Sequence, residues 1–370
     1  MPSPKKGNLS DKSESMSKDK ENEHVKLYRC IPESFLFLPK WIRLFFGHVL
    51  TIFITFTFLT IPFTLILLLP PVWRTFSTIS TTWIALIVVS YFLPPIEIPA
   101  IRKIFELWYE IFDFHHNMSP EDIDRIVREG KTKQFIIGMH PHGIIPLQAF
   151  LWTAYADQYL RLDGTEYEPL YGFGAAADAV NYIPILRNIM HFLSAGSAAY
   201  KVLLKGLTEG KSLPCNNAGR KPRHLYILPG GVAEVFASEV GRHAIVFKDR
   251  RGLIRLSLQT GAELIPCYVF GGTDFFHNLA TTGNLLAQLS RKYKMGITWF
   301  WGKFRLPIPF TPKVTMCIGE PLSVEKWTGE GRIPDDVIDE LHQRYIDAIQ
   351  NLFDKYKVHV GYPDAALEVL

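Results

Sequence analysis

Two long apolar segments near the N-terminus constrain this chain more than any other feature of its sequence. Residues 44–69 contain no Asp, Glu, Lys or Arg, and a second apolar segment covers residues 79–98. A helix needs roughly 20 apolar residues to cross a bilayer, so the first segment is long enough. The short link between the segments carries a single charge, Arg74. We therefore expect a membrane hairpin over residues 40–98, whose two arms either span the bilayer or form a re-entrant wedge.

Charged residues on both sides of the hairpin predict its orientation. Lys40 and Arg43 precede the first segment, and Arg102 and Lys103 follow the second. Because cations next to membrane segments favour the cytosolic side, we expect both ends of the hairpin, and the rest of the chain, in the cytosol. The stretch 1–26 is rich in Lys, Glu, Asp and Ser and is expected to be a disordered tail.

Composition narrows the class of partner. The formal net charge of +4 is too weak to indicate a nucleic-acid-binding protein, but it suits an anionic membrane surface or an anionic cosubstrate. The four cysteines are scattered and form no CxxC pair, so we expect neither a disulfide framework nor a thiolate metal site.

After about residue 100 the sequence changes to alternating strand and helix patterns. Short apolar runs at 135–139, 169–173, 224–228, 263–269 and 314–318 predict strands. Helical patterns lie between them at 147–160, 198–207 and 252–260, and a last amphipathic helix is predicted at 335–356. This alternation predicts an α/β domain over residues 100–360, with a mostly parallel sheet flanked by helices. Residues 361–370 are expected to form a C-terminal tail.

A His-Pro-His-Gly motif at residues 140–143 follows the first predicted strand of this domain. Ligands of open α/β sheets bind beyond the carboxyl ends of the strands, which is where both imidazoles fall. Three interpretations compete: a metal site, a catalytic base, or a polar turn. A metal site needs further ligands from later strand ends, and these offer no second histidine cluster, so no metal is expected.

A catalytic base needs a group to orient it and donors for a developing oxyanion. Glu234 follows a glycine-rich turn after the predicted strand at 224–228 and is a candidate for the orienting acid. Lys248, Arg250, Arg251 and Arg255 open the next predicted helix, where cations oppose the helix dipole. A bound polyanion and a solvated surface turn explain these cations equally well.

Together these motifs resemble the type-2 diacylglycerol acyltransferase family, over about residues 40 to 357. The matching blocks are HPHG at 140–143, IPILRNI at 183–189, LPGGVAE at 228–234, KDRRGLIRLSLQTGAELIPCYVFG at 248–271 and GEPL at 319–322. This family includes monoacylglycerol and wax-alcohol acyltransferases. Two departures are the glycine at position 272, where the family commonly has Glu or Gln, and a missing Tyr-Phe-Pro tripeptide upstream of the HPHG motif.

The resemblance implies transfer of a fatty acyl group from acyl-CoA to the hydroxyl of diacylglycerol, without a cofactor. It implies an enzyme of the endoplasmic reticulum membrane with its catalytic domain in the cytosol. A location on the lipid-droplet surface and a homo-oligomeric state are both compatible with it. His142 is the preferred base, with His140 as its positioning or oxyanion group and Glu234 as the acid. Relatives with His-x-x-x-x-Asp place an aspartate where this chain has Ile145 and Leu147, so the acid must come from elsewhere. Expected substrate-binding residues are Pro141, Gly143, Arg187, Gly230, Gly231, Lys248, Arg251 and Arg255.

The sequence leaves the acceptor open. Monoacylglycerol or a long-chain alcohol is the alternative to diacylglycerol. The shape of the substrate cavity selects the acceptor, and the sequence motifs do not distinguish these three molecules. A non-catalytic lipid-binding protein and a metal-dependent membrane hydrolase are the remaining alternatives.

Overall fold

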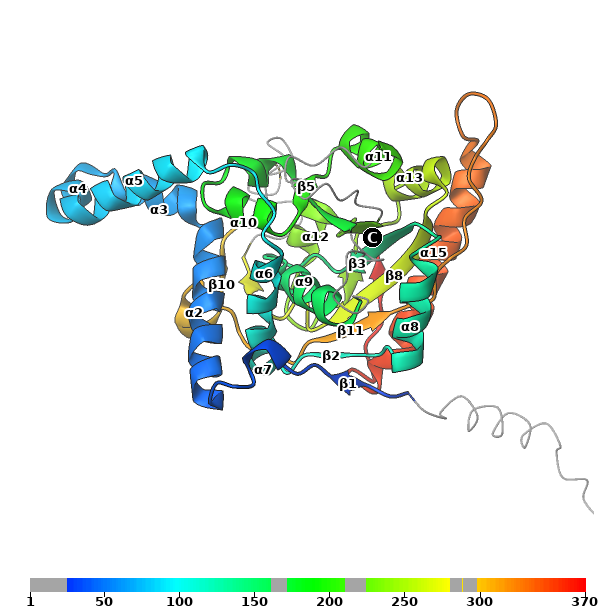
Figure 1. Ribbon diagram of the computed structural model, residues 1–370, viewed down its shortest axis with the longest axis horizontal. Helices are drawn as coiled ribbons and strands as arrows, with labels where there is room; N and C mark the ends of the chain where they lie inside the picture. The colour runs from blue at the N-terminus through cyan, green and yellow to red at the C-terminus, as the bar shows by residue number, and fades with distance from the viewer. Residues whose placement is uncertain (1–24, 161–171, 210–223, 280–287, 289–297) are drawn as a thin grey trace, which may run out of the picture.

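A mixed eight-stranded sheet forms the centre of the protein (Figure 1). The computed structural model describes residues 25–160, 172–209, 224–279, 288 and 298–370. The strands run in the order β1 (Tyr28–Arg29), β2 (His115–His116), β11 (Thr315–Ile318), β8 (Glu263–Phe270), β3 (Phe135–His140), β6 (His224–Ile227), β4 (Gly172–Ala176) and β5 (Ala195–Ser197). From β8 to β5 the neighbouring strands are parallel, whereas β11 is antiparallel to β8. The predicted α/β class with a helix-flanked sheet is confirmed.

Helices cover both faces of this sheet. They are α8 (Pro120–Glu129), α9 (Leu147–Tyr159), α10 (Leu186–Phe192), α11 (Tyr200–Glu209), α12 (Gly231–Ala237), α13 (Gly252–Thr260) and α15 (Asp335–Lys357). Side chains of β3 alternate between the two faces, as a pleated strand requires. Phe135, Ile137 and Met139 pack in the core that includes α9, whereas Ile136 packs in the core that includes α11, α13 and α15. All six residues of β3 are buried, which explains its continuous apolar sequence.

The first apolar segment is not one straight helix. It divides into α2 (Lys40–Phe58) and α3 (Thr60–Leu67), with a break at Leu59, where the backbone leaves helical geometry. Among the described residues, α2 is the one helix long and apolar enough to cross a membrane. It lies along the side of the domain and packs on α7 (Leu107–Ile111), where Arg43 forms a two-pronged ion pair with Glu110.

The projecting hairpin is therefore shorter than the sequence predicts. It consists of α3, α4 (Pro70–Thr75) and α5 (Ser77–Phe92), and the predicted second arm at 79–98 stops being helical after Phe92. Trp83 of α5 donates a hydrogen bond to the Thr64 hydroxyl of α3, at 2.9 Å, which joins the two arms. Figure 1 shows the hairpin extending away from the domain at the upper end of α2.

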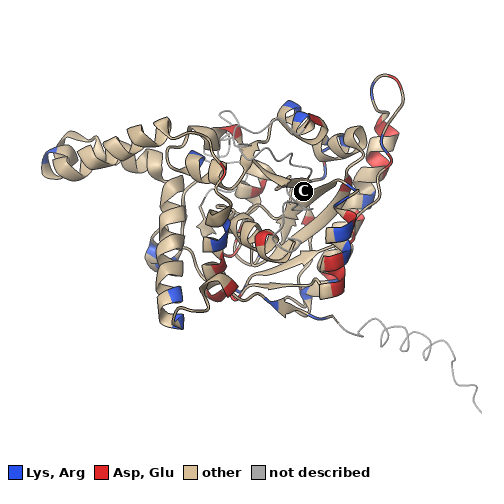
Figure 2. Cartoon of the chain, in the orientation of Figure 1, with Lys and Arg blue, Asp and Glu red and all other residues tan. Residues whose placement is uncertain are grey.

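The exposed surface of this helical region is apolar. One face of α2 packs inward, while Phe45, Phe46, Val49, Ile52 and Phe53 on its other face are exposed. Figure 2 shows that charged residues are sparse on α3 to α5 and frequent on α15 and α8. A large exposed apolar surface of this kind is typical of a protein that contacts a bilayer or another protein.

The expectation that residues 361–370 form a tail is wrong. Strand β12 (Glu368–Val369) pairs in parallel with β7 (Ala244–Ile245), and the Leu370 carbonyl accepts hydrogen bonds from the backbone amides of Phe247 and Lys248. The pairing is two residues long on each strand, which is too short to leave a periodic pattern in the sequence. The expected disordered tail at 1–26 lies almost wholly outside the described residues.

The contact of Gly47 with α7 generates a stability prediction. A Cβ at Gly47 would lie 2.9 Å from a side-chain carbon of Ile111 and 3.1 Å from the Leu107 carbonyl oxygen. Gly47→Leu should therefore lower the free energy of unfolding by about 1–3 kcal/mol through overpacking. Thermal unfolding of the detergent-solubilised protein measures the change. Val49→Leu, on the exposed face of the same helix, is the control and should have no effect. Equal unfolding temperatures for both variants would mean that α2 does not pack on α7.

Candidate active site

His140 ends β3 and is completely buried on the face of the sheet that packs against α15. Its ring makes an edge contact with Phe247 and lies beside Tyr345, with centroid distances of 5.5 and 6.1 Å. Nδ1 of His140 lies 3.1 Å from Oε1 of Glu234, and neither side chain is accessible to solvent. This enclosure keeps the His140 ring from touching a substrate, so its effect on chemistry must pass through Glu234.

The Glu234 carboxylate connects three separate segments of the chain. Its Oε1 accepts hydrogen bonds from the His140 ring and from the backbone amide of Val246, at 2.9 Å. Its Oε2 accepts a hydrogen bond of 2.6 Å from the backbone amide of His142. Burial alone raises the pKa of Glu234, but the His140 ring and these donors outweigh it and hold the pKa below its ordinary value. The carboxylate therefore stays ionised and fixes the turn that carries His142.

A glycine makes room for this carboxylate. A Cβ at Gly230 would lie 1.8 to 2.3 Å from three atoms of the Glu234 side chain, which folds back over the start of α12. The next residue, Gly231, has a φ of +48°, which favours glycine. Two glycines are thus required here for steric reasons that the sequence does not show. From the sequence alone they are expected for a different reason, the approach of backbone amides to an anion.

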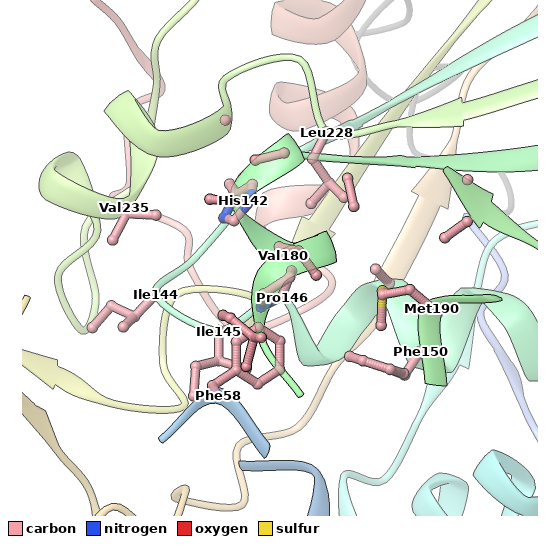
Figure 3. Close-up of a pocket in the computed structure, with 18 of the residues that line it drawn as sticks. Phe58, His142, Ile144, Ile145, Pro146, Phe150, Val180, Met190, Leu228 and Val235 are labelled. Carbon is pink, nitrogen blue, oxygen red and sulfur yellow. The ribbon is translucent and has the colours of Figure 1, made fainter. Parts of the chain in front are cut away.

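His142 lies beyond the strand with its ring on a cavity (Figure 3). Nδ1 is 2.9 Å from the Gly143 carbonyl oxygen, which can only accept, so Nδ1 carries the proton and Nε2 is the free basic nitrogen. Gly143 has a φ of +70°, and a Cβ there would be 2.7 Å from the Gly272 carbonyl oxygen. The glycine after the histidine is therefore required by the turn that aims the ring.

The charge state of His142 suits a base. Burial lowers the pKa of His142 below its ordinary value, and the positive charge of Arg250 lowers it further. The bond to the Gly143 carbonyl and the negative charge of Glu234 oppose this shift without cancelling it. The imidazole is consequently neutral at neutral pH and able to accept a proton.

The cavity next to His142 has a volume of about 1000 Å³ and mostly apolar walls. This volume is at the upper end of the usual range for small-molecule sites, about 300–1,000 Å³. Figure 3 shows His142 at one end and Phe58 of α2 at the other. Residues of α3, including Ile61, Pro62 and Leu65, also line the cavity, so it extends from the candidate base to the root of the projecting hairpin.

The structure separates the other expected substrate-binding residues. Arg251 forms an ion pair of 2.7 Å with Asp339 of α15, and Arg255 lies 3.7 Å from Asp335. Lys248 is exposed on the surface. None of these three cations lines the cavity. Their placement favours the solvated-turn interpretation over a cluster on one ligand.

Two further expected residues, Arg187 and Pro141, also lie outside the cavity lining. Arg187 lies over the Tyr91 ring of α5, at 5.3 Å, and attaches the hairpin to the domain. Pro141 is buried, and its carbonyl oxygen accepts a hydrogen bond from Gln148. Neither residue lines the cavity, so both contribute to the arrangement of the site from outside it.

One cation of the predicted group does line the cavity. Arg250 borders it together with His142 and Gly231, whereas the cations predicted to bind substrate were the other three. Arg250 is the arginine of the Arg-x-Gly pattern at 250–252, which is the signal in the sequence that singles it out. The turn between β7 and α13 then places its side chain at the cavity. In the described part of the chain, no group of three His, Cys, Asp or Glu side chains could hold a metal ion.

A buried glutamate that holds a histidine at the end of an apolar cavity is an arrangement suited to acid–base chemistry. The diacylglycerol acyltransferase family model matches residues 74–370, so the chain belongs to this family, and the resemblance seen in the sequence is confirmed.

Curated relatives agree with this membership. The chain is 30% identical over 256 residues to diacylglycerol O-acyltransferase 1 of Eremothecium gossypii, a match that covers 64% of this chain and 50% of that protein. It is 30% identical over 239 residues to diacylglycerol O-acyltransferase 2 of Dictyostelium discoideum, covering 61% and 66%. For the human diacylglycerol O-acyltransferase 2 the values are 28% over 251 residues, covering 64% and 61%. The matches thus span half to about two thirds of these relatives.

The chain also has a weak likeness to the solved structure of a 1-acyl-sn-glycerophosphate acyltransferase of Thermotoga maritima. It is 13% identical, covers 86% of this chain and 98% of its own, and has a TM-score of 0.35. A likeness this low supports no conclusion about the fold or the reaction.

Because Glu234 packs directly on Gly230, adding one methyl group at position 230 should strongly lower the stability of the protein. Gly230→Ala should displace the Glu234 carboxylate and break its buried hydrogen bonds, at a cost of about 3–5 kcal/mol in unfolding free energy. Gly252→Ala is a matched control, because a Cβ there meets no atom within 4 Å. The control should be neutral or stabilising by about 0.5–1 kcal/mol. Equal unfolding temperatures for the two variants, measured by thermal unfolding in detergent, would contradict the buried carboxylate network.

Proposed function

We propose that this protein transfers a fatty acyl group from acyl-CoA to the free hydroxyl of diacylglycerol, which gives triacylglycerol and CoA. One observation carries the proposal: the free Nε2 of His142 borders an apolar cavity that reaches the projecting apolar hairpin. Membership of the diacylglycerol acyltransferase family and the names of its relatives support this choice of substrates.

The chemistry of the reaction requires a base at this position. The acceptor hydroxyl attacks the thioester carbonyl carbon and gives its proton to Nε2 of His142, because an alcohol is a weak nucleophile until its proton is removed. The carbonyl oxygen becomes an oxyanion in the tetrahedral intermediate. When this intermediate collapses, the C–S bond breaks, and the CoA sulfur takes the proton from the imidazolium. Glu234 fixes the backbone of His142 during both steps through its 2.6 Å hydrogen bond.

The position of the cavity fits substrates of different solubility. Diacylglycerol and triacylglycerol partition into the bilayer, and α3 lines the cavity at the root of the apolar hairpin. We propose that the acceptor enters there from the bilayer, while acyl-CoA arrives from the aqueous side. The hairpin then holds the enzyme on the endoplasmic reticulum membrane, with the catalytic domain in the cytosol.

An exposed loop near α2 supports the same orientation. Trp299, Phe304 and Leu306 are 67%, 86% and 50% exposed, and the neighbouring Lys303 is close enough to His48 of α2 to interact with it electrostatically. Aromatic and apolar side chains beside a cation are typical of segments that insert at a lipid headgroup layer. We propose that α2 and this loop contact one surface of the bilayer.

The test is an assay with defined acceptors. The protein in liposomes receives labelled acyl-CoA with diacylglycerol, monoacylglycerol or a long-chain alcohol, with and without a chelator. We expect triacylglycerol from diacylglycerol, no effect of the chelator, and a loss of rate of about 100-fold or more in His142→Ala, since general-base catalysis contributes 10²–10⁴. His359→Ala, an exposed histidine outside the cavity, should retain full activity.

Three outcomes would contradict the proposal. A higher rate with monoacylglycerol or the alcohol would reassign the acceptor. Sensitivity to the chelator would indicate a metal-dependent reaction. Full activity of His142→Ala would remove the base from the mechanism.

A further inference from the structure

Arg250 is the cation of the segment 248–255 that faces the cavity. Arg251 and Arg255 point to carboxylates of α15, and Lys248 is exposed to solvent. Arg250 instead borders the cavity beside His142, from the turn that leads into α13. The mechanism described above assigns this side chain no role.

The guanidinium of Arg250 has few partners of its own. Its Nη1 donates to the Pro229 carbonyl oxygen at 3.3 Å, and no carboxylate of the described residues forms an ion pair with it. The same Nη1 would lie 4.0 Å from a Cβ at Gly231, so it lies over the Gly-Gly turn. A cation that borders an apolar cavity without a counterion is costly to desolvate, and an anion placed next to it offsets this cost.

The charged groups around His142 indicate on which side of its ring a negative charge would be stabilised. Glu234 faces His142 from α12, and Arg250 faces it from the turn before α13; His140 lies beyond Glu234 and is enclosed by Phe247 and Tyr345. The negative group is thus held on the backbone side of His142, whereas the positive group borders the space that a substrate would fill.

We propose that Arg250 is a catalytic residue that donates hydrogen bonds to the oxyanion of the tetrahedral intermediate. This inference rests on the proposed acyl transfer. When the acceptor oxygen bonds to the thioester carbon and its proton moves to His142, the carbonyl π electrons move to the carbonyl oxygen, and Arg250 holds the resulting negative charge. When the C=O bond re-forms, the C–S bond breaks and the CoA sulfur takes the proton from His142. Arg250 keeps its own protons throughout.

The position of Arg250 favours the reacting carbonyl over the CoA phosphates. Phosphates are strongly hydrated, and a mostly apolar cavity is an unfavourable place for them. Arg250 shares a mostly apolar cavity with the base, where a single small charge gains most from a fixed donor. Arginine in this position therefore acts on the transition state more than on the bound ground state.

Steady-state kinetics in the liposome assay test the inference with Arg250→Gln, Arg250→Lys and the surface control Arg332→Gln. Arg250→Gln should lower kcat by about 100- to 1,000-fold, the usual cost of one oxyanion donor, with KM for acyl-CoA changed less than about threefold. The acid limb of its pH–rate profile should move to higher pH, because loss of the positive charge raises the pKa of His142. Arg250→Lys keeps the charge, so it should keep the acid limb and recover part of kcat. Arg332→Gln should match the wild type.

Each remaining outcome has a distinct meaning. A kcat of Arg250→Gln within threefold of wild type overturns the inference, and a loss that lies only in KM for acyl-CoA assigns Arg250 to CoA binding instead. If Arg250→Gln does not fold, an Arg250→Lys variant with full kcat and KM shows that charge alone matters and refutes a fixed donor geometry. A wild-type protein that forms no triacylglycerol refutes the proposed function itself, which separates that failure from a failure of the Arg250 role.

Discussion

The buried carboxylate of Glu234 is the interaction on which the rest of the site depends. It joins the end of β3, the turn after it and the strand that leads to α13, because it accepts hydrogen bonds from His140, His142 and Val246. A buried carboxylate without these donors would be strongly destabilising, so the three segments and the charge stabilise one another. The two histidines consequently have different positions: His140 is enclosed in the core, and His142 faces the cavity.

The cavity connects this network to the apolar hairpin. Its walls include α3 and the end of α2, so the position of the hairpin and the shape of the cavity depend on each other. The Arg43–Glu110 ion pair and the close contact at Gly47 fix α2 on the domain. The proposed transfer to a bilayer lipid needs such a rigid connection, since reacting atoms must be placed accurately.

The sequence predicted the regular elements well and the details of the site less well. The helix at 252–260 has the predicted bounds, because its apolar spacing records the core that it covers. By contrast, the break at Leu59 and the pairing of β12 with β7 depend on tertiary contacts that leave no period. The sequence indicated both histidines and Glu234, but it did not show which cation of the segment 248–255 faces the cavity, since the folded turn places Arg250 there.

The Glu234→Gln variant tests the central claim most directly, because glutamine has nearly the same shape but only one accepting oxygen. One of the two groups of donors, the His142 amide or the His140 ring with the Val246 amide, must then lose its acceptor. The account predicts that kcat for triacylglycerol formation falls by about 100-fold, the cost of misplacing a catalytic group by about 1 Å. A variant with the kcat of the wild type would show that the carboxylate does not hold the base in place.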